Sequence, residues 1–75
     1  MPVDDEFRAA LRDMIEATGM TQAAFAAKAE MRTATLSDLL TGRTRRVWLD
    51  TIAKLATAMQ METDELLREI RRRRQ

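Results

Sequence analysis

GMTQAAFAAKAEMRTATLSDLLTG, residues 19–42, is the stretch that decides the fold. Two short segments without glycine or proline, Gln22 to Ala29 and Thr33 to Thr41, lie between glycines at its two ends. Alanine and leucine recur in both segments, and these residues favour the α-helix. A turn of about three residues joins the segments, which is the spacing of a helix-turn-helix. Thr21 is placed to cap the first of the two predicted helices.

The second predicted helix has two different faces, because side chains advance by about 100° per residue around a helix. Leu36, Leu39 and Leu40 share one side. The opposite side carries short residues that form hydrogen bonds or contact methyl groups, namely Thr33, Ala34, Ser37 and Asp38. A face of this kind can enter the major groove of DNA, which is about 12 Å wide. For an isolated helix, however, a polar face usually means only that the face is solvated.

The remainder of the chain also predicts helices, from Asp4 to Thr18, from Leu49 to Gln60, and from Thr63 or Asp64 onward. Asp4 is a suitable N-cap for the first, and Gly19 is expected to end it in a left-handed conformation. The last helix is expected to fray into Arg71–Arg74. The fold class is therefore all-α with five helices. Residues 1–75 form one domain, with a helix-turn-helix at about 21–41 and an arginine-rich tail at 71–75.

The apolar positions of these helices predict one core. The inward positions of the first and fourth helices are Phe7, Leu11, Met14, Ile15, Leu49, Ile52, Leu55, Ala56 and Met59. Trp48, the only tryptophan, is expected to cover this core, and an exposed anchor at a protein interface is the alternative. Leu40 belongs either to the core or to an interface.

The charge is unevenly distributed along the chain. The formal net charge is +1, but residues 1–30 carry −3 and residues 31–48 carry +3. The positive part holds Arg32, Arg43, Arg45 and Arg46, with Asp38 as its single acid. Arginines on both sides of a small polar helix face are suited to contact phosphates on either side of a groove.

Several classes of function find no support in the sequence. The chain has no cysteine and no histidine, so zinc ligation and the common nucleophile–base pairs are missing. We therefore expect no enzymatic activity, no catalytic residue, no metal, no cofactor and no small-molecule ligand. The longest apolar run, Ala23 to Ala27, is too short for a membrane span, and the acidic start MPVDDEF is not a signal peptide. A cytoplasmic location is expected.

Residues Gly19–Gly42 resemble the helix-turn-helix of phage repressor and Cro proteins, the XRE family. The matching positions are Gly19, Thr21, Gln22, Phe25, Ala26, Met31, Thr35, Leu36, Ser37 and Gly42. The likeness continues through LDTIAKLATAM and TDELL, so it covers about residues 7–67. It implies a lambda-repressor-like fold and a bacterial, archaeal or phage origin.

The resemblance also implies a function and a set of roles. The function is a sequence-specific regulator of transcription, a repressor that binds double-stranded DNA as a homodimer on a near-palindromic operator. The positions that match base-reading residues are Arg32, Thr33, Ala34, Ser37 and Asp38. The positions that match phosphate contacts are Gln22, Arg43, Thr44, Arg45 and Arg46. Leu67 and Ile70 are our guess for the dimer interface.

Three residues depart from the family pattern. Glu30 replaces a turn glycine, and it costs on the order of 1 kcal/mol if φ is positive there. Arg32 replaces a capping Ser or Thr, so Thr33 is expected to cap in its place. Trp48 replaces a Ser that often opens the fourth helix. The longer loop before Leu49 resembles that of members serving as antitoxins. The alternative function is therefore an antitoxin of a toxin–antitoxin pair, which binds a small toxin protein and can also bind its own operator.

Overall fold

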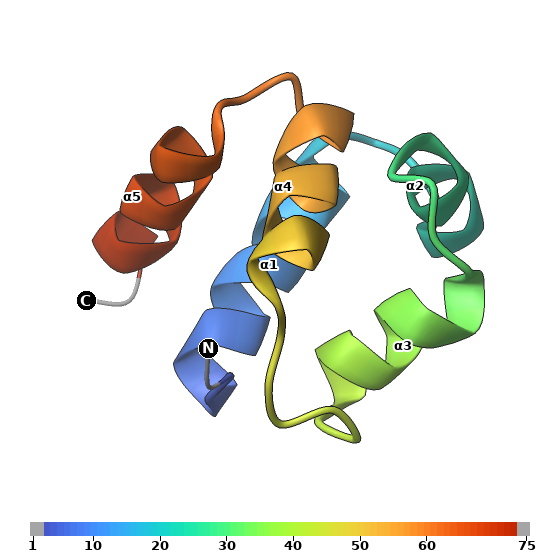
Figure 1. Ribbon diagram of the computed structural model, residues 1–75, viewed down its shortest axis with the longest axis horizontal. Coiled ribbons are helices and arrows are strands. Elements are labelled where there is room, and N and C mark those ends of the chain that lie inside the picture. Colours follow the sequence, from blue (N-terminus) through green and yellow to red (C-terminus); the bar gives the residue numbers. More distant parts are fainter. Residues whose placement is uncertain (1–2, 74–75) are drawn as a thin grey trace.

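The computed structural model describes residues 3–73, and five helices lie within that range (Figure 1). They are α1 (Asp5–Ala17), α2 (Gln22–Lys28), α3 (Thr33–Thr41), α4 (Leu49–Ala58) and α5 (Thr63–Arg73). All five predicted helices are confirmed. The expected fraying of the last one is wrong for Arg71–Arg73, which are helical, and residues 74 and 75 of the predicted tail lie outside the described residues. Within residues 3–73, no helix has the length and apolar character needed to cross a membrane.

The helices surround one core. In Figure 1, α1 and α4 occupy the middle of the view, α5 lies on one side, and α2 and α3 lie on the other. α1 packs against both α3 and α5, α2 packs against α3, and α4 packs against α5. The largest fully buried side chains are Phe7, Leu11, Phe25, Leu36, Leu40, Ile52, Leu55 and Leu66. The predicted inward face of α1, the leucine side of α3 and the inward positions Ile52, Leu55 and Ala56 of α4 are buried as predicted.

The helix starts differ in how they are capped. The Asp4 carboxylate accepts a hydrogen bond from the Phe7 N–H at 2.8 Å, and the Thr21 hydroxyl accepts one from the Ala24 N–H at 3.1 Å. Both predicted caps are confirmed. The expectation that Thr33 caps α3 is wrong. Arg32 has the extended backbone of an N-cap, and its carbonyl already accepts from the Leu36 N–H at 3.2 Å, so Thr33 lies inside the helix.

Helices α2 and α4 end in the same backbone motif. The Met31 N–H donates to the Ala26 carbonyl at 2.9 Å, and the Met61 N–H donates to the Ala56 carbonyl at 2.9 Å. This is the long hydrogen bond of a Schellman motif, which needs a left-handed residue just before its donor. Glu30 and Gln60 occupy that position, with φ of 57° and 60°. The sequence left the turn conformation at Glu30 open, and the structure shows that its φ is positive.

Replacing Glu30 with glycine should therefore stabilise the protein. A residue with a Cβ lowers the stability of the folded protein by about 1–2 kcal/mol when it adopts the left-handed conformation, and glycine removes this cost. Part of the gain is offset because glycine also increases the conformational entropy of the unfolded chain. We expect Glu30→Gly to raise the free energy of unfolding by about 1 kcal/mol and the melting temperature by about 4–8 °C. Thermal unfolding followed by circular dichroism measures both.

Two matched variants separate backbone strain from charge. Glu30→Ala removes the carboxylate but keeps the Cβ, so it should leave the melting temperature nearly unchanged. Gln60→Gly relieves the same conformation at the end of α4 without changing any charge, so it should give a similar gain. A gain from Glu30→Ala equal to that from Glu30→Gly would show that charge, and not φ, decides the effect.

Two predicted core positions are wrong. The side chain of Trp48 is 78% exposed and that of Leu49 is 66% exposed. Val47, which is 4% exposed, fills the core at this point of the chain, so the next residue faces outward. Leu49 fits the apolar spacing of α4, but it is the first residue of the helix, where the core does not cover its side chain. Leu40 is 2% exposed and belongs to the core.

Candidate nucleic-acid interface

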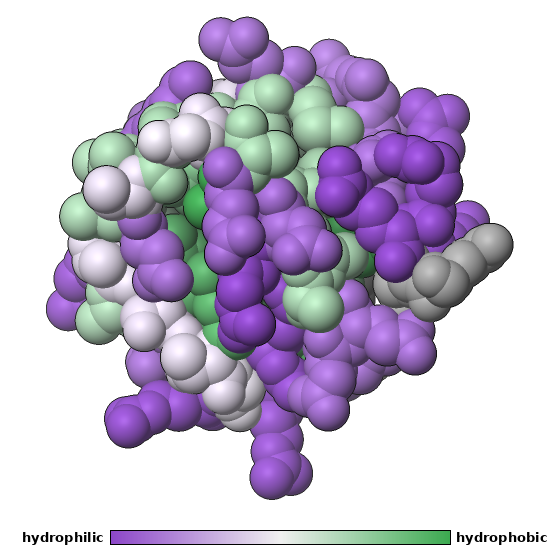
Figure 2. Space-filling model, turned by 180° about the vertical axis from the view of Figure 1, so that it is seen from behind, coloured by the Kyte–Doolittle hydropathy of each residue, from purple (hydrophilic) through white to green (hydrophobic). Residues whose placement is uncertain are grey.

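Helix α3 has the two faces that its sequence predicts. Leu36, Leu39 and Leu40 are buried, whereas Thr33 and Ala34 are exposed. Ser37 and Asp38 are half-buried. Seen from behind in Figure 2, the side of the molecule that carries α2 and α3 shows many white and light green side chains, with some purple ones among them. The side that carries α5 is mainly purple. The outer residues of α3, Thr33, Ala34, Ser37 and Asp38, all have short side chains, so no long side chain on this face would keep the helix from entering a groove.

The loop after α3 is held by its backbone while its arginine side chains are exposed. Gly42 ends the helix with φ of 91°. The Thr44 N–H then donates to the Asp38 carbonyl at 3.2 Å, which turns the loop back along α3. The Val3 N–H donates to the Arg45 carbonyl at 2.9 Å. These bonds fix the positions from which the side chains of Arg43, Arg45 and Arg46 project, all three of them exposed.

Two arginines of α1, Arg8 and Arg12, lie beside the C-terminal end of α3, and this role was not predicted from the sequence. Arg12 donates through Nη2 to the Leu40 carbonyl at 2.6 Å, where the negative end of the helix dipole favours a cation. Arg8 donates through Nη1 to the Val3 carbonyl at 3.0 Å. The Arg8 guanidinium also lies beside Gly42, where a Cβ would be in van der Waals contact with it at 3.4 Å, so the positive φ, and not lack of space, is what favours glycine here. Arg8 and Arg12 are four residues apart, so they lie on one face of α1. This spacing is the only feature of the sequence that indicates their shared location.

The arginines divide into two groups by their partners. Side chains with a hydrogen bond or ion pair to another protein group belong to α1 and α5; they are Arg8, Arg12, Arg68, Arg72 and Arg73. In the part of the chain that the structure describes, the arginine side chains without such a partner are Arg32, Arg43, Arg45, Arg46 and Arg71. Four of these five border α3. Most of the unpaired arginines of the described residues are thus gathered around the predicted reading face.

The other predicted site residues lie in different places. Gln22 is the first residue of α2 and is exposed, and Thr44 is half-buried in the loop. Ile70 is only 2% exposed and belongs to the monomer core, so its side chain is already covered within one copy. Leu67 is half-buried and packs against that core. Both lie on α5, on the opposite side of the molecule from α3 in Figure 1.

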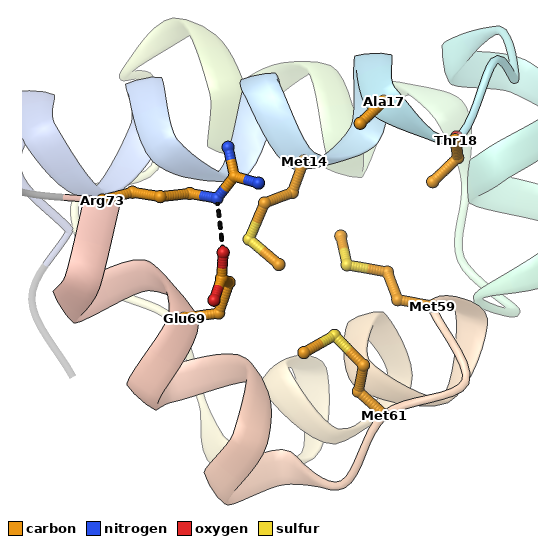
Figure 3. Close-up of a pocket in the computed structure, with 7 residues that line it drawn as sticks. All are labelled: Met14, Ala17, Thr18, Met59, Met61, Glu69 and Arg73. Atoms are coloured by element: carbon orange, nitrogen blue, oxygen red, sulfur yellow. Dashed lines mark hydrogen bonds and ion pairs between the residues drawn. The ribbon is translucent and has the colours of Figure 1, made fainter.

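A separate pocket of about 300 Å³ lies between α1, the α4–α5 turn and α5 (Figure 3). Met14, Met59 and Met61 line it, and Glu69 and Arg73 form an ion pair at its edge, with Nε and Oε1 2.9 Å apart. Hydrogen bonds from Arg72, and then from Arg73, lower the pKa of Glu69 to about 2. Arg72 and Arg73 of the arginine-rich tail are thus paired with Glu69 of the same helix.

The comparison with protein families gives one match. Residues 10–70 match the model of the Cro/C1-type HTH DNA-binding domain, which includes all of α2, α3 and α4. No curated protein and no solved structure matches the chain. The match extends over most of the 75 residues, and the five helices with the two-faced α3 fit it. The chain therefore belongs to the Cro/C1-type HTH DNA-binding domain family, and it is a DNA-binding regulator of transcription.

Proposed function

We propose that the protein is a cytoplasmic transcriptional repressor that binds a near-palindromic operator as a homodimer. The observation that carries this proposal is the grouping around α3 of four of the five arginines without a partner in the described protein, whereas the arginines of α1 and all those of α5 except Arg71 are paired. Occupation of an operator that overlaps a promoter excludes the polymerase by steric overlap. Repression therefore requires no activity beyond tight, selective binding.

We assign two kinds of DNA contact to these residues, one to phosphates and one to base edges. Arg43, Arg45 and Arg46 would bind phosphates, with Gln22 and Thr44 as neutral donors. The base contacts would come from α3: Thr33 and Ala34 offer methyl groups to thymine, Ser37 can bond several base edges, and Asp38 can accept from the cytosine amino group. Arg32, at the start of α3, has the geometry for a bidentate contact with guanine.

The small number of these contacts favours a dimer. Helix α3 has nine residues, and only its outer face can reach base edges. One copy would read too few base pairs to select a site. Two copies related by a two-fold axis read two half-sites, whose centres lie about one turn of DNA apart, or 10–10.5 bp.

Selection from a random pool of duplexes at near-physiological salt tests this function. We expect sequencing of the bound fraction to recover an inverted repeat with about 10 bp between the half-site centres. Recovery of no common sequence, with weak and strongly salt-dependent binding only, would contradict sequence-specific repression.

Truncation of Ser37 or Thr33 tests the assignment of base readers. Each base-edge contact contributes about 1–3 kcal/mol of discrimination, so Ser37→Ala and Thr33→Ala should each relax preference at one position of the half-site by about 5- to 150-fold. Binding to the selected operator and to all single-base variants measures this. Thr57→Ala removes a hydroxyl on α4 that donates to the Ala53 carbonyl, away from α3, and should change nothing. Uniform weakening on all sequences would show that Ser37 and Thr33 do not read bases.

A second candidate function is that of an antitoxin. The observation in its favour is the exposure of Trp48, since tryptophan is enriched at protein interfaces. Co-expression with the product of an adjacent gene tests it. A stable, stoichiometric complex that also neutralises toxicity of that product would support it, and free migration of the two proteins on gel filtration would contradict it.

A further inference from the structure

Among residues 3–73, the large apolar side chains that are exposed belong to Trp48 and Leu49, which follow one another where the loop enters α4. We call these two residues the Trp48–Leu49 patch. A concave surface of about 170 Å³ adjoins it, with Thr35 and Leu39 of α3 on one side and Trp48 and Thr51 on the other. The patch therefore lies directly beside the helix proposed to read DNA.

Folding of one copy does not account for a tryptophan at this position. Trp48 is the N-cap residue of α4, and its side chain makes no capping hydrogen bond, whereas Asp4 and Thr21 cap α1 and α2. Ser, Thr, Asp and Asn are the residues that stabilise an N-cap. A large apolar side chain that lacks both burial and a capping role breaks two local rules together, and such departures concentrate at functional sites.

We propose that the Trp48–Leu49 patch is the surface through which a second copy of this chain docks. The inference rests on the proposed function, in that it supplies the two-fold contact that a near-palindromic operator requires. In a two-fold interface the same patch is used twice, so each Trp48 packs against the concave surface between α3 and α4 of the other copy.

The size of the molecule favours this surface over the outer side of α5. Half-site centres on DNA lie about 34–36 Å apart. The described chain measures 28 × 26 × 22 Å, and α3 and α5 lie at opposite edges of it (Figure 1). Contact through α5 would separate the two α3 helices by close to twice the molecular width, which is more than one turn of DNA. Contact through the patch keeps both helices near the two-fold axis.

The charges around the patch are compatible with a symmetric contact. The patch is uncharged, with the exposed Arg46 on one side along the chain and the exposed Asp50 on the other. A two-fold axis that passes through the patch at right angles to the chain aligns the two segments in opposite directions. The Arg46 side of one copy then faces the Asp50 side of the other, so unlike charges meet.

Trp48 provides its own test, because it is the only tryptophan in the chain and its fluorescence reports on this surface alone. The protein is diluted over a wide concentration range without DNA, and both the emission maximum and the mass by sedimentation equilibrium are followed. We expect the emission to shift to shorter wavelength as the mass doubles, because docking removes the indole from water.

Trp48→Ser is the decisive variant. Serine can cap α4, so this change should raise the melting temperature of the monomer by about 4–8 °C, and lost association cannot then be ascribed to unfolding. Loss of an aromatic anchor should weaken dimerisation by about 30-fold or more. Leu67→Ala, on the opposite side of the molecule, is the matched control and should leave dimerisation intact.

The outcomes separate this inference from the proposed function. A doubled mass that persists in Trp48→Ser, or that disappears in Leu67→Ala alone, overturns the patch as the contact surface. A shift in emission that accompanies binding of one copy to a single half-site or to a toxin, with no shift when the mass doubles, also overturns it, because the occupant is then not a second copy. If the dimer forms through Trp48 but no operator is selected, the inference stands and the proposed function fails. If Trp48→Ser binds a duplex with a single half-site as tightly as the parent monomer does, the base contacts of α3 do not depend on the Trp48–Leu49 patch.

Discussion

Replacement of Arg43 and Arg45 by alanine should weaken binding to every duplex by about the same factor, about 100-fold at low salt, since each charge-assisted hydrogen bond to phosphate contributes about 1.5 kcal/mol. The ranking of sequences should not change, because phosphate contacts carry no base information. Both side chains are exposed and have no partner within the described protein, so their removal leaves the fold intact. The bond from the Val3 N–H to the Arg45 carbonyl involves backbone atoms only and is retained.

The salt dependence of the same variant gives an independent measure. Each lost phosphate contact should flatten the plot of log affinity against log salt by about 0.9, so the slope per bound copy should fall by about 2. Fluorescence anisotropy on a duplex with a single half-site gives this slope without contributions from dimerisation. Arg68→Ala with Arg71→Ala on α5 removes equal charge from the opposite side and is the control. Equal losses from both double variants would show that net charge, and not the loop, drives binding.

Phe25→Ala should have the largest effect on stability. The Phe25 side chain is fully buried and holds α2, the first helix of the pair that positions α3. Truncation of a buried phenylalanine costs about 3–5 kcal/mol. A chain of 75 residues has a total stability of about 4–11 kcal/mol, so the variant should be largely or partly unfolded at 37 °C. Chemical denaturation followed by circular dichroism gives the free energy.

Phe25→Leu is the matched variant for this position. It keeps an apolar side chain in the same cavity, so we expect a loss of about 1–2 kcal/mol with DNA binding retained. If Phe25→Ala keeps its stability but loses DNA binding, then Phe25 acts by orienting α3 and not by supporting the core. A small effect of both variants on stability would contradict the packing described for α2.

Much of this fold could be predicted from local features of the sequence. Asp4, Thr21 and Gly19 mark helix ends by short-range chemistry, and the three leucines of α3 separate its faces by spacing alone. Tertiary packing decides which apolar side chains are exposed, and the spacing of apolar residues along one helix does not predict that packing. Leu49 fits the apolar pattern of α4 and is nevertheless exposed, and Ile70, a guess for the dimer surface, is buried. Val47 fills the core where Trp48 was expected.

The candidate site was predictable to a smaller extent. Its position on α3 and in the loop follows from the concentration of arginines and the small polar face. The support from Arg8 and Arg12 depends on contacts between α1 and residues more than twenty positions away, as with Leu40, and no local pattern encodes such contacts. The division of arginines into paired and unpaired groups likewise required the three-dimensional arrangement, except for Glu69 with Arg72 and Arg73, whose spacing of three and four residues predicts pairing.

The hydrogen bond between the Val3 N–H and the Arg45 carbonyl has a practical consequence for labelling. A fluorophore, surface anchor or reporter joined ahead of Val3 would enter the molecule beside the loop that is proposed to grip DNA. Cargo joined after Arg73 leaves from the far edge, where α5 ends (Figure 1). Attachment at the C-terminal side is therefore the arrangement that leaves the loop undisturbed in single-molecule or immobilised binding measurements.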